Sequence, residues 1–254
     1  MTARSTSVEF PMSPILLYGI PAGCSFGSIV ALEWTGRPYR LSRITMPGAV
    51  TSDAFLALNP VAETPAFVTA NGDVLTESIA ILGHIGAQAL DRGLAFRQGS
   101  ADFDRLNRML AWLNTTFFNA FGALWYVYEH DTEGAEKAAL QAYGRGKVLK
   151  AHRQLEALLE RGEGPWLLGA RRTLADAYFT GIARWADYHA VFERDAFPRV
   201  AALRARLADD AGVQFAHAIE ENLPPPASSA FEGHVSLDDA LASARGIVAS
   251  ARAV

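Results

Sequence analysis

The sequence has very little cysteine: Cys24 is the only one among 254 residues. A single cysteine cannot form a disulfide within the chain, and this usage is typical of proteins kept in a reducing compartment. Residues 1–10 are mostly polar and have no apolar centre, so they do not resemble a secretory signal peptide. We therefore expect a cytoplasmic protein.

Long apolar runs and an excess of positive charge are also missing. No run reaches the roughly 18 apolar residues that a membrane-spanning helix needs, so we expect no membrane partner. The 23 Lys and Arg residues against 27 Asp and Glu residues give a formal net charge of -4. Such a balance creates no field that attracts phosphates, so we expect no nucleic-acid partner.

Signatures of metal and nucleotide sites are missing as well. The six histidines do not pair with one another or with Cys24 at metal-ligand spacing. The sequence contains no phosphate-binding glycine loop, no nucleophile elbow and no dinucleotide fingerprint. We therefore expect no metal ion.

The residues that are present describe a globular protein with two regions of different character. Half of the residues are hydrophobic and a fifth are charged, which is usual for a chain with a sizeable core. Up to about residue 90, short apolar runs alternate with glycine and proline, and beyond it long stretches have helical periodicity. The predicted regions are a tail at 1–13, a small domain at 14–90, a linker at 91–100, a helical domain at 101–222 and a C-terminal extension at 223–254.

The pattern of the small domain predicts an α+β fold. Its predicted elements are a strand at 15–18, a helix from about 24 to Gly36, a strand at 39–46, an irregular stretch, a hairpin around Asn71–Gly72 and a helix from 79. An Asn-Gly pair between two apolar runs is a strong hairpin signal. This order predicts a mixed sheet with helices packed on it.

Periodicity in the second half predicts a series of helices. They are expected at 101–128, 134–161, from 173 onward, at 197–207 and at 212–221, with a peripheral helix at 236–251 capped by Ser236. Thr173 and Asp176 have the spacing of a capping box, which we assign to folding. The aromatic residues of 101–128 either belong to the core or line an apolar pocket between the domains.

The pair Cys24–Ser25 lies where the first strand turns into the first helix. A helix N-terminus presents free N–H groups and the positive end of a dipole, which predicts a lowered pKa for the Cys24 thiol. The Ser25 hydroxyl could donate to the same anion. The alternative is that Cys24 is a small buried apolar residue.

Two further segments have both a functional and a structural interpretation. Pro65 begins a strand, and a cis peptide there would turn the backbone of Thr64 outward to pair with another peptide. The alternative is an ordinary trans proline. Ser78, at a helix start, could bind a carboxylate and Glu77 an amino group, or both could simply cap the helix.

Taken together, these segments resemble the cytosolic glutathione transferases. The Cys24–Ser25 turn is similar to that of the bacterial beta class. The other similar segments are 55–60 (Phe-Leu-Ala-Leu-Asn-Pro), 63–67 (Glu-Thr-Pro-Ala-Phe) and 71–78 (Asn-Gly-Asp-Val-Leu-Thr-Glu-Ser). The resemblance implies an N-terminal thioredoxin-like βαβ-ββα domain followed by an all-helical domain. It also implies a homodimer, and a detoxification enzyme that uses glutathione as co-substrate against a hydrophobic electrophile.

The resemblance also implies a role for each candidate residue. Thr64 would pair with the cysteinyl backbone of glutathione, with Pro65 in cis. Glu77 and Ser78 would hold the γ-glutamyl end. Ser25 or Cys24 would stabilise the glutathione thiolate, or Cys24 would form a mixed disulfide with it.

Two alternatives remain beside the transferase. One is a Cys24-dependent thiol-disulfide or reductive enzyme on the same fold, and the other is a non-catalytic binding or regulatory protein. The second alternative is motivated by departures from the family pattern. Glu63 precedes Thr64, and residues 45–50 contain no lysine. A separate departure, which concerns the class, is that Phe118-Asn119 stands where the beta class has a His-Lys pair.

Overall fold

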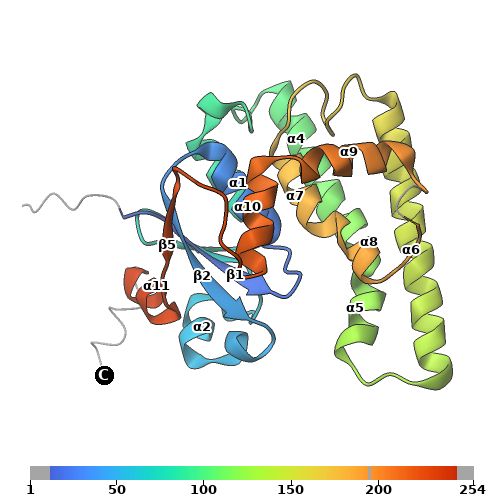
Figure 1. Cartoon of the computed structure of the whole chain (residues 1–254), viewed down its shortest axis with the longest axis horizontal. Helices are drawn as coiled ribbons and strands as arrows, with labels where there is room; N and C mark the ends of the chain where they lie inside the picture. Colours follow the sequence, from blue (N-terminus) through green and yellow to red (C-terminus); the bar gives the residue numbers. More distant parts are fainter. Residues whose placement is uncertain (1–11, 194–195, 245–254) are drawn as a thin grey trace, which may run out of the picture.

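A computed structural model describes residues 12–193 and 196–244 of the chain (Figure 1). Its strands are β1 (Ile15–Ile20), β2 (Tyr39–Thr45), β3 (Ala66–Val68), β4 (Val74–Thr76) and β5 (Phe231–His234). They form one sheet in the order β4-β3-β1-β2-β5. β2 runs parallel to β1 and β5, whereas β3 is antiparallel to β1 and β4. The predicted mixed sheet of an α+β fold is confirmed.

The two faces of the sheet belong to two separate cores. The small-domain helices are α1 (Phe26–Thr35), α2 (Asp53–Leu58) and α3 (Ser78–Gln88), with 3-10 turns η1 (Gly48–Thr51) and η2 (Leu90–Arg92). Leu16 and Tyr18 pack in the core that contains α1 and α3, and Ile15 and Leu17 pack in the core that contains α2. Alternation along β1 produces this division, because successive strand side chains point to opposite faces.

Local signals predicted the turns of the small domain correctly. The hairpin between β3 and β4 turns at Gly72, whose φ of +83° suits glycine. Gly36 ends α1 in the left-handed conformation. The stretch between the second strand and the hairpin, predicted to be irregular, instead contains the two short helices η1 and α2. Ser52 caps α2 by accepting the N–H of Phe55 at 3.3 Å; a six-residue helix is too short for its periodicity to be recognised.

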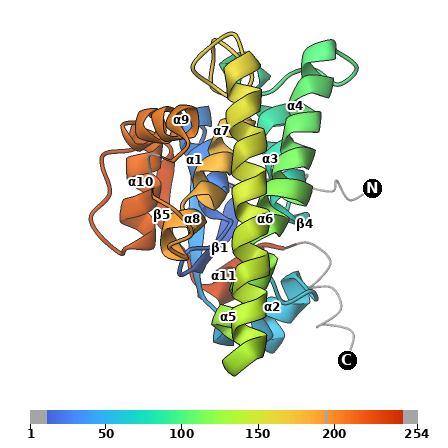
Figure 2. The same ribbon diagram turned by 90° about the vertical axis from the view of Figure 1, so that its right-hand side faces the viewer.

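The second half of the chain is helical, as predicted. Its elements are α4 (Ala101–Trp112), a π-helical segment η3 (Leu113–Phe117), a 3-10 segment η4 (Phe118–Phe121), α5 (Gly122–Glu129), α6 (Gly134–Arg161), α7 (Leu174–Ala183), α8 (Trp185–Tyr188), α9 (Pro198–Ala208) and α10 (Ala211–Glu220). The single helix expected at 101–128 is a succession of segments whose hydrogen bonding changes at residue 113. Figure 2 shows α6 upright in front of the other elements, on the side of the molecule that faces the viewer in this view. Among the described residues, no helix combines the length and apolar character needed to cross a membrane.

Helix α7 joins the two halves of the molecule. It begins at the predicted capping box, where the buried Asp176 carboxylate accepts the N–H groups of Thr173 at 2.8 Å and Leu167 at 2.9 Å. It then crosses α1 at two glycines, Gly27 and Gly181. A Cβ on Gly27 would lie 2.7 Å from the Ala177 carbonyl oxygen. This close crossing brings the helical domain against the beginning of α1.

The C-terminal extension is part of the small domain. β5, which the sequence did not predict, extends the sheet beyond β2. After it, α11 (Leu237–Ser243) packs beside α2 on the second face of the sheet, as Figure 1 shows. Ser236 caps α11 as predicted, accepting the N–H of Asp239 at 3.0 Å. The helix expected at 236–251 already ends at Ser243, and residues 245–251 lie outside the described part of the chain.

Candidate active site

The turn between β1 and α1 is held in one tight conformation. The backbone N–H of Gly19 donates to the Ser25 hydroxyl at 3.0 Å, and the N–H of Phe26 donates to the carbonyl of Gly23 at 3.3 Å. A Cβ on Gly23 would lie 2.4 Å from the carbonyl oxygen of Gly19, so only glycine fits there. The turn fixes Cys24 just before α1, at the carboxyl end of β1.

Cys24 meets two of the other predicted site residues. Its thiol donates to the carbonyl of Thr64 with a sulfur-to-oxygen distance of 3.5 Å, and the Ser78 hydroxyl donates to the sulfur at 3.5 Å. The peptide between Thr64 and Pro65 is cis, as predicted. A Cβ on Gly19 would lie 2.2 Å from the Thr64 side-chain oxygen, so this glycine allows Thr64 to approach β1. Residues that are distant in sequence therefore converge at one point.

The thiol of Cys24 does not have the lowered pKa that its position predicted. Burial is the largest influence, and it raises the pKa above the ordinary cysteine value. The Ser78 hydrogen bond and the positive charge of Arg184 act in the opposite direction, whereas the charge of Glu63 adds to the increase. The predicted lowering was wrong because loss of solvation at the thiol outweighs the favourable groups around it.

Ser25 lies beside Cys24 in sequence, but its side chain has different neighbours. The residue is completely buried, and its hydroxyl accepts the N–H of Gly19 at the end of β1. Its backbone carbonyl accepts the N–H groups of Ser28 and Ile29 and so begins α1. The hydrogen bond of the Ser25 hydroxyl therefore ties the turn together.

Glu77 stands at the start of α3 with an unusual backbone. Its φ is +69°, a conformation that is rare for residues other than glycine and that often marks a functional site. The residue is exposed, and its charge acts on the carboxylate of Glu63. Burial raises the pKa of Glu63, and the charges of Glu129 and Glu77 raise it further. This side of the site would attract a cationic group.

Two residues of the helical domain that contact the candidate site were not predicted from the sequence. The indole N–H of Trp185 donates to the Ala22 carbonyl at 2.8 Å. The guanidinium of Arg184 donates to the Gly23 carbonyl at 3.0 Å. Both carbonyls belong to the turn before Cys24. The partners are more than 160 residues apart in the chain, so no local pattern predicts them.

Aromatic rings extend from Trp185 toward the surface. The ring of Trp125 lies 5.2 Å from that of Trp185 and stacks on Tyr188 at 5.3 Å. Tyr128 contacts both Trp125 and Tyr188 edge to face. The side chains of Tyr128 and Tyr188 are exposed. Trp185 therefore connects the Cys24 turn to a cluster of aromatic rings that reaches the surface.

Comparison with known proteins agrees with this geometry. The family model described as "Glutathione S-transferase, N-terminal domain" matches residues 24–88, which include Cys24, Thr64 and Ser78. The model described as "Glutathione S-transferase, C-terminal domain" matches residues 116–210. Together they cover more than half of the chain, in the order of its two structural halves. The chain belongs to the glutathione S-transferase family.

Several relatives match this glutathione S-transferase over most of their length. Glutathione S-transferase GstA from Escherichia coli O157:H7 is 26% identical over 206 residues, which are 80% of this chain and 98% of that protein. The structure of a sphingomonad glutathione S-transferase complexed with glutathione has a TM-score of 0.71 at 27% identity, covering 82% of this chain and 98% of that one. A beta-class enzyme from Sphingomonas chungbukensis has a TM-score of 0.70 at 27% identity, covering 81% and 98%.

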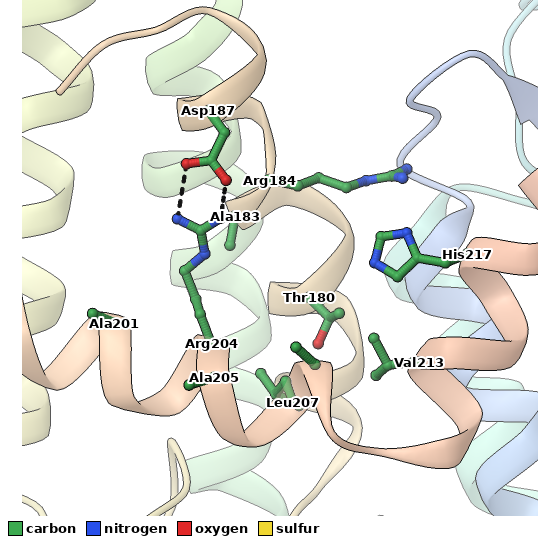
Figure 3. A pocket seen from close by; sticks show the side chains of 11 residues that line it. Thr180, Ala183, Arg184, Asp187, Ala201, Arg204, Ala205, Leu207, Val213 and His217 are labelled. Atoms are coloured by element: carbon green, nitrogen blue, oxygen red, sulfur yellow. Dashed lines mark hydrogen bonds and ion pairs between the residues drawn. The ribbon is translucent and has the colours of Figure 1, made fainter. Parts of the chain in front are cut away.

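A separate cavity of about 250 Å³ lies within the helical half of this transferase. Its walls come from α7, α8, α9 and α10, and Cys24 does not line it. Figure 3 shows Arg204 paired with Asp187 on one side, whereas the Arg184 side chain, which also lines the cavity, reaches toward the ribbon of the small domain. No group of three or more His, Cys, Asp or Glu residues that could hold a metal ion occurs among residues 12–193 and 196–244.

Proposed function

We propose that this protein binds glutathione at the Cys24 turn, stabilises its thiolate and transfers it to a small apolar electrophile. The observation that carries the proposal is the convergence of Cys24, Thr64 and Ser78 at distances of 3.5 Å. Three chain segments supply these groups, and the same three segments carry the resemblance to glutathione transferases.

The cysteinyl and γ-glutamyl parts of glutathione each have a complementary group at this site. The backbone of Thr64 pairs with the cysteinyl unit of the tripeptide, following cis Pro65. Ser78 begins α3, where free N–H groups and the helix dipole favour the γ-glutamyl carboxylate. The exposed carboxylate of Glu77 binds the amino group at the same end of the ligand.

The reaction is a nucleophilic substitution or addition at the sulfur of glutathione. The thiol loses its proton to solvent, and the thiolate forms a bond to the electrophilic carbon. In a substitution a leaving group departs with the bonding electrons. In an addition the π bond breaks, its electron pair moves to the neighbouring atom, and that atom takes a proton from solvent. The protein favours the charged form of the sulfur and aligns it with its target. The exposed rings of Tyr128 and Tyr188, packed on the half-buried ring of Trp125, supply an apolar surface for an aromatic electrophile.

Between Cys24 and Ser25, we propose that Cys24 is the residue next to the glutathione sulfur, as in the beta class. Its thiol contacts the residues that hold glutathione, whereas the Ser25 hydroxyl already accepts a hydrogen bond from Gly19. The same contacts favour a second candidate function. In it, the Cys24 thiolate attacks a glutathionyl disulfide and releases the other thiol, and a second glutathione then resolves the mixed disulfide and leaves as glutathione disulfide.

Glutathione binding and turnover test the proposal. Calorimetry with the full chain should show binding at or below millimolar glutathione, and a panel of aromatic electrophiles should be conjugated. Binding without turnover in either conjugation or disulfide reduction would instead favour the non-catalytic alternative. Absence of binding at millimolar glutathione would exclude the proposed function.

Two variants separate the two chemistries. In Cys24→Ala, disulfide reduction should be abolished, and conjugation should fall by roughly tenfold to a thousandfold, the range expected when one positioned stabilising group is lost. The matched variant Ser25→Ala should act chiefly on stability, because it leaves the N–H of Gly19 without a partner. Conjugation that survives Cys24→Ala and is lost in Ser25→Ala would reverse our assignment.

We also propose a homodimer in the cytoplasm, with the small domain of one subunit against the helical domain of the other. A groove of about 510 Å³ between α4 and α6, with Met109, Trp112 and Leu158 in its lining, supports a second copy as its occupant. Sedimentation equilibrium should give twice the chain mass, and cell fractionation should place the protein in the cytoplasm. A monomer at micromolar concentration would contradict the dimer.

A further inference from the structure

Arg184 connects the helical domain to the turn that carries Cys24. One guanidinium nitrogen donates to the Gly23 carbonyl at 3.0 Å, and the Nε donates to the carbonyl of Gly181 at 2.9 Å. Both terminal nitrogens also donate to the Glu220 carboxylate, one of them at 2.8 Å. The guanidinium lies 4.2 Å from the ring centre of Phe26. The Arg184 guanidinium therefore donates to three separate acceptors, the Gly23 carbonyl, the Gly181 carbonyl and the Glu220 carboxylate.

Glu220 is itself fixed to the sheet. It is the last residue of α10, and the carbonyl groups of Ile219 and Glu220 accept hydrogen bonds from Arg43 of β2 at 2.7 and 2.8 Å. Its side chain is only 9% exposed and that of Arg184 is 19% exposed. A buried guanidinium held by a fork-shaped pair has little freedom to rotate. The orientation of Arg184 is thus set by an element anchored to the small domain.

We propose that Arg184 is a positioning residue for the site at Cys24, held in place by Glu220. This inference rests on the proposed function. The Gly23 carbonyl accepts two N–H groups, from Phe26 and from Arg184, and it belongs to the peptide that leads into Cys24. If that peptide tilts, the sulfur moves away from the Thr64 carbonyl and the Ser78 hydroxyl. A displacement of about 1 Å at a reacting group can lower the rate on the order of 100-fold.

A second ion pair in the same region supplies a matched comparison. Arg204 and Asp187 line the cavity of Figure 3, as Arg184 does, and their side chains are 15% and 30% exposed. Arg204 donates to Asp187 in the same two-pronged way. Within the described part of the chain, none of the Arg204 hydrogen bonds goes to the Cys24 turn. A purely structural role for Arg184 therefore predicts that the two arginines respond alike to the same substitution.

The experiment compares Arg184→Lys with Arg204→Lys in the full chain. Lysine keeps the positive charge but cannot bind Glu220 and the Gly23 carbonyl together. Because Cys24 is the only cysteine, alkylation by iodoacetamide reports on this thiol alone and needs no glutathione. Besides burial and the backbone hydrogen bond at Cys24, the side chains that act on the thiol are Ser78, Glu63 and Arg184, and Arg184→Lys substitutes only the last of them.

For Arg184→Lys we expect the pH midpoint of alkylation to move upward, because the displaced sulfur loses the Ser78 hydrogen bond. We also expect kcat/KM for glutathione conjugation to fall by about tenfold or more. For Arg204→Lys, the alkylation midpoint should stay constant and kcat/KM should remain within about twofold, although Tm falls in both variants. Glu220→Gln, which keeps the size of the side chain, should shift both readouts in the direction of Arg184→Lys.

The outcomes distinguish this inference from the proposed function. If Arg184→Lys and Arg204→Lys lower Tm equally and neither changes alkylation or turnover, the positioning role is rejected. If Arg184→Lys fails to fold, the test passes to Glu220→Gln. A folded Glu220→Gln variant whose alkylation midpoint does not move rejects the positioning role as well. A shifted alkylation profile in a protein that neither binds nor conjugates glutathione would reject the proposed function and leave the positioning of Cys24 by Arg184 supported.

Discussion

At the scale of single residues, His152 is the clearest buried titratable group away from the candidate site. It lies on α6 with no exposed surface, and its Nδ1–H donates to the Val148 carbonyl at 2.9 Å. The Nε2 atom has no hydrogen-bond partner among the described residues, and the ring centres of Phe117 and Phe192 lie within 4.7 Å of that of His152. Burial is the main cause that lowers its pKa to about 4. The folded protein therefore holds this histidine neutral.

This histidine predicts a loss of stability in mild acid. Between pH 6.5 and about 4 the unfolded chain binds the proton and the folded chain does not, so the free energy of unfolding falls as the pH falls. The full difference is on the order of 3 kcal/mol. In His152→Leu this contribution disappears. The free energy of unfolding in urea should therefore fall less between pH 7 and pH 4.5 in the variant than in the wild type.

The comparison between wild type and variant isolates the histidine. Burial raises the pKa of Asp176 to about 6. Its contribution therefore has the opposite sign, because stability from this group increases as the pH falls below 6. That contribution is common to both proteins and cancels in the difference. An equal loss of stability between pH 7 and pH 4.5 in wild type and His152→Leu would show that His152 does not titrate in this range.

The residues of the candidate site were predictable only where the chain itself carries the pattern. Cys24, Thr64 and Ser78 each lie at a boundary between a strand or loop and a following element, so proline, glycine and capping signals marked them. Arg184 and Trp185 lie inside a helical stretch with no distinguishing spacing. Their partners in the turn are set by tertiary packing, and the burial that raises the Cys24 pKa also depends on packing.

At the scale of elements, the crossing of α1 and α7 determines how the helical domain meets the site. A Cβ on Gly27 would lie 2.7 Å from the Ala177 carbonyl oxygen and 2.8 Å from the Cα of Tyr178. Both are backbone atoms, so the contact cannot be relieved by a side-chain rotation. A Cβ on Gly181 would lie 3.0 Å from the Gly27 nitrogen. The two helices approach this closely only because glycine occupies both positions.

Gly27→Ala should therefore separate the helices and destabilise the protein by about 2 to 4 kcal/mol, as overpacking of a tight core does. The control is Gly83→Ala on α3, where an added Cβ meets no atom within 4 Å. There the higher helix propensity of alanine should raise stability by up to about 1 kcal/mol. Urea unfolding at pH 7 measures both. Equal free energies of unfolding in the two variants would contradict the proposed role of the crossing.

Elements differ in how well the sequence reveals them. The long helix α6 has the predicted bounds because its periodicity runs for 28 residues. β5 has four residues, contains Gly233 at a φ of +109° and pairs with β2, almost 200 residues earlier. Such a strand has no alternation of its own to recognise. Its existence depends on the open edge of β2, which is a property of the assembled sheet.

At the scale of the whole molecule, the C-terminal extension completes the small domain. Ser228 donates to the Glu33 carboxylate at 2.7 Å, and the His234 ring lies within hydrogen-bond distance of the Tyr18 hydroxyl at 3.1 Å. On the other face of the sheet, Ala240 is buried in the core that contains α2. The extension therefore covers both the edge of β2 and part of one face.

A chain that ends at residue 227 should lose this cover and become less stable. The backbone groups of β2 would form an open sheet edge, which promotes pairing between molecules, and apolar side chains beneath α11 would meet water. We expect Tm to fall by about 5 °C or more, since each kcal/mol is worth roughly 2–4 °C in a chain of this size. Light scattering should also reveal aggregation on warming.

A chain that ends at residue 244 is the matched control, because it keeps β5 and α11. It should have the Tm of the full chain. If its Tm falls as far as that of the chain ending at residue 227, the loss of stability is due to residues 245–254 instead. The two chains should differ little in glutathione binding at 15 °C, because none of the removed side chains contacts Cys24, Thr64 or Ser78 in the described structure. If the chain ending at residue 227 has the full Tm and stays monodisperse, the first four strands suffice and the extension does not stabilise the sheet.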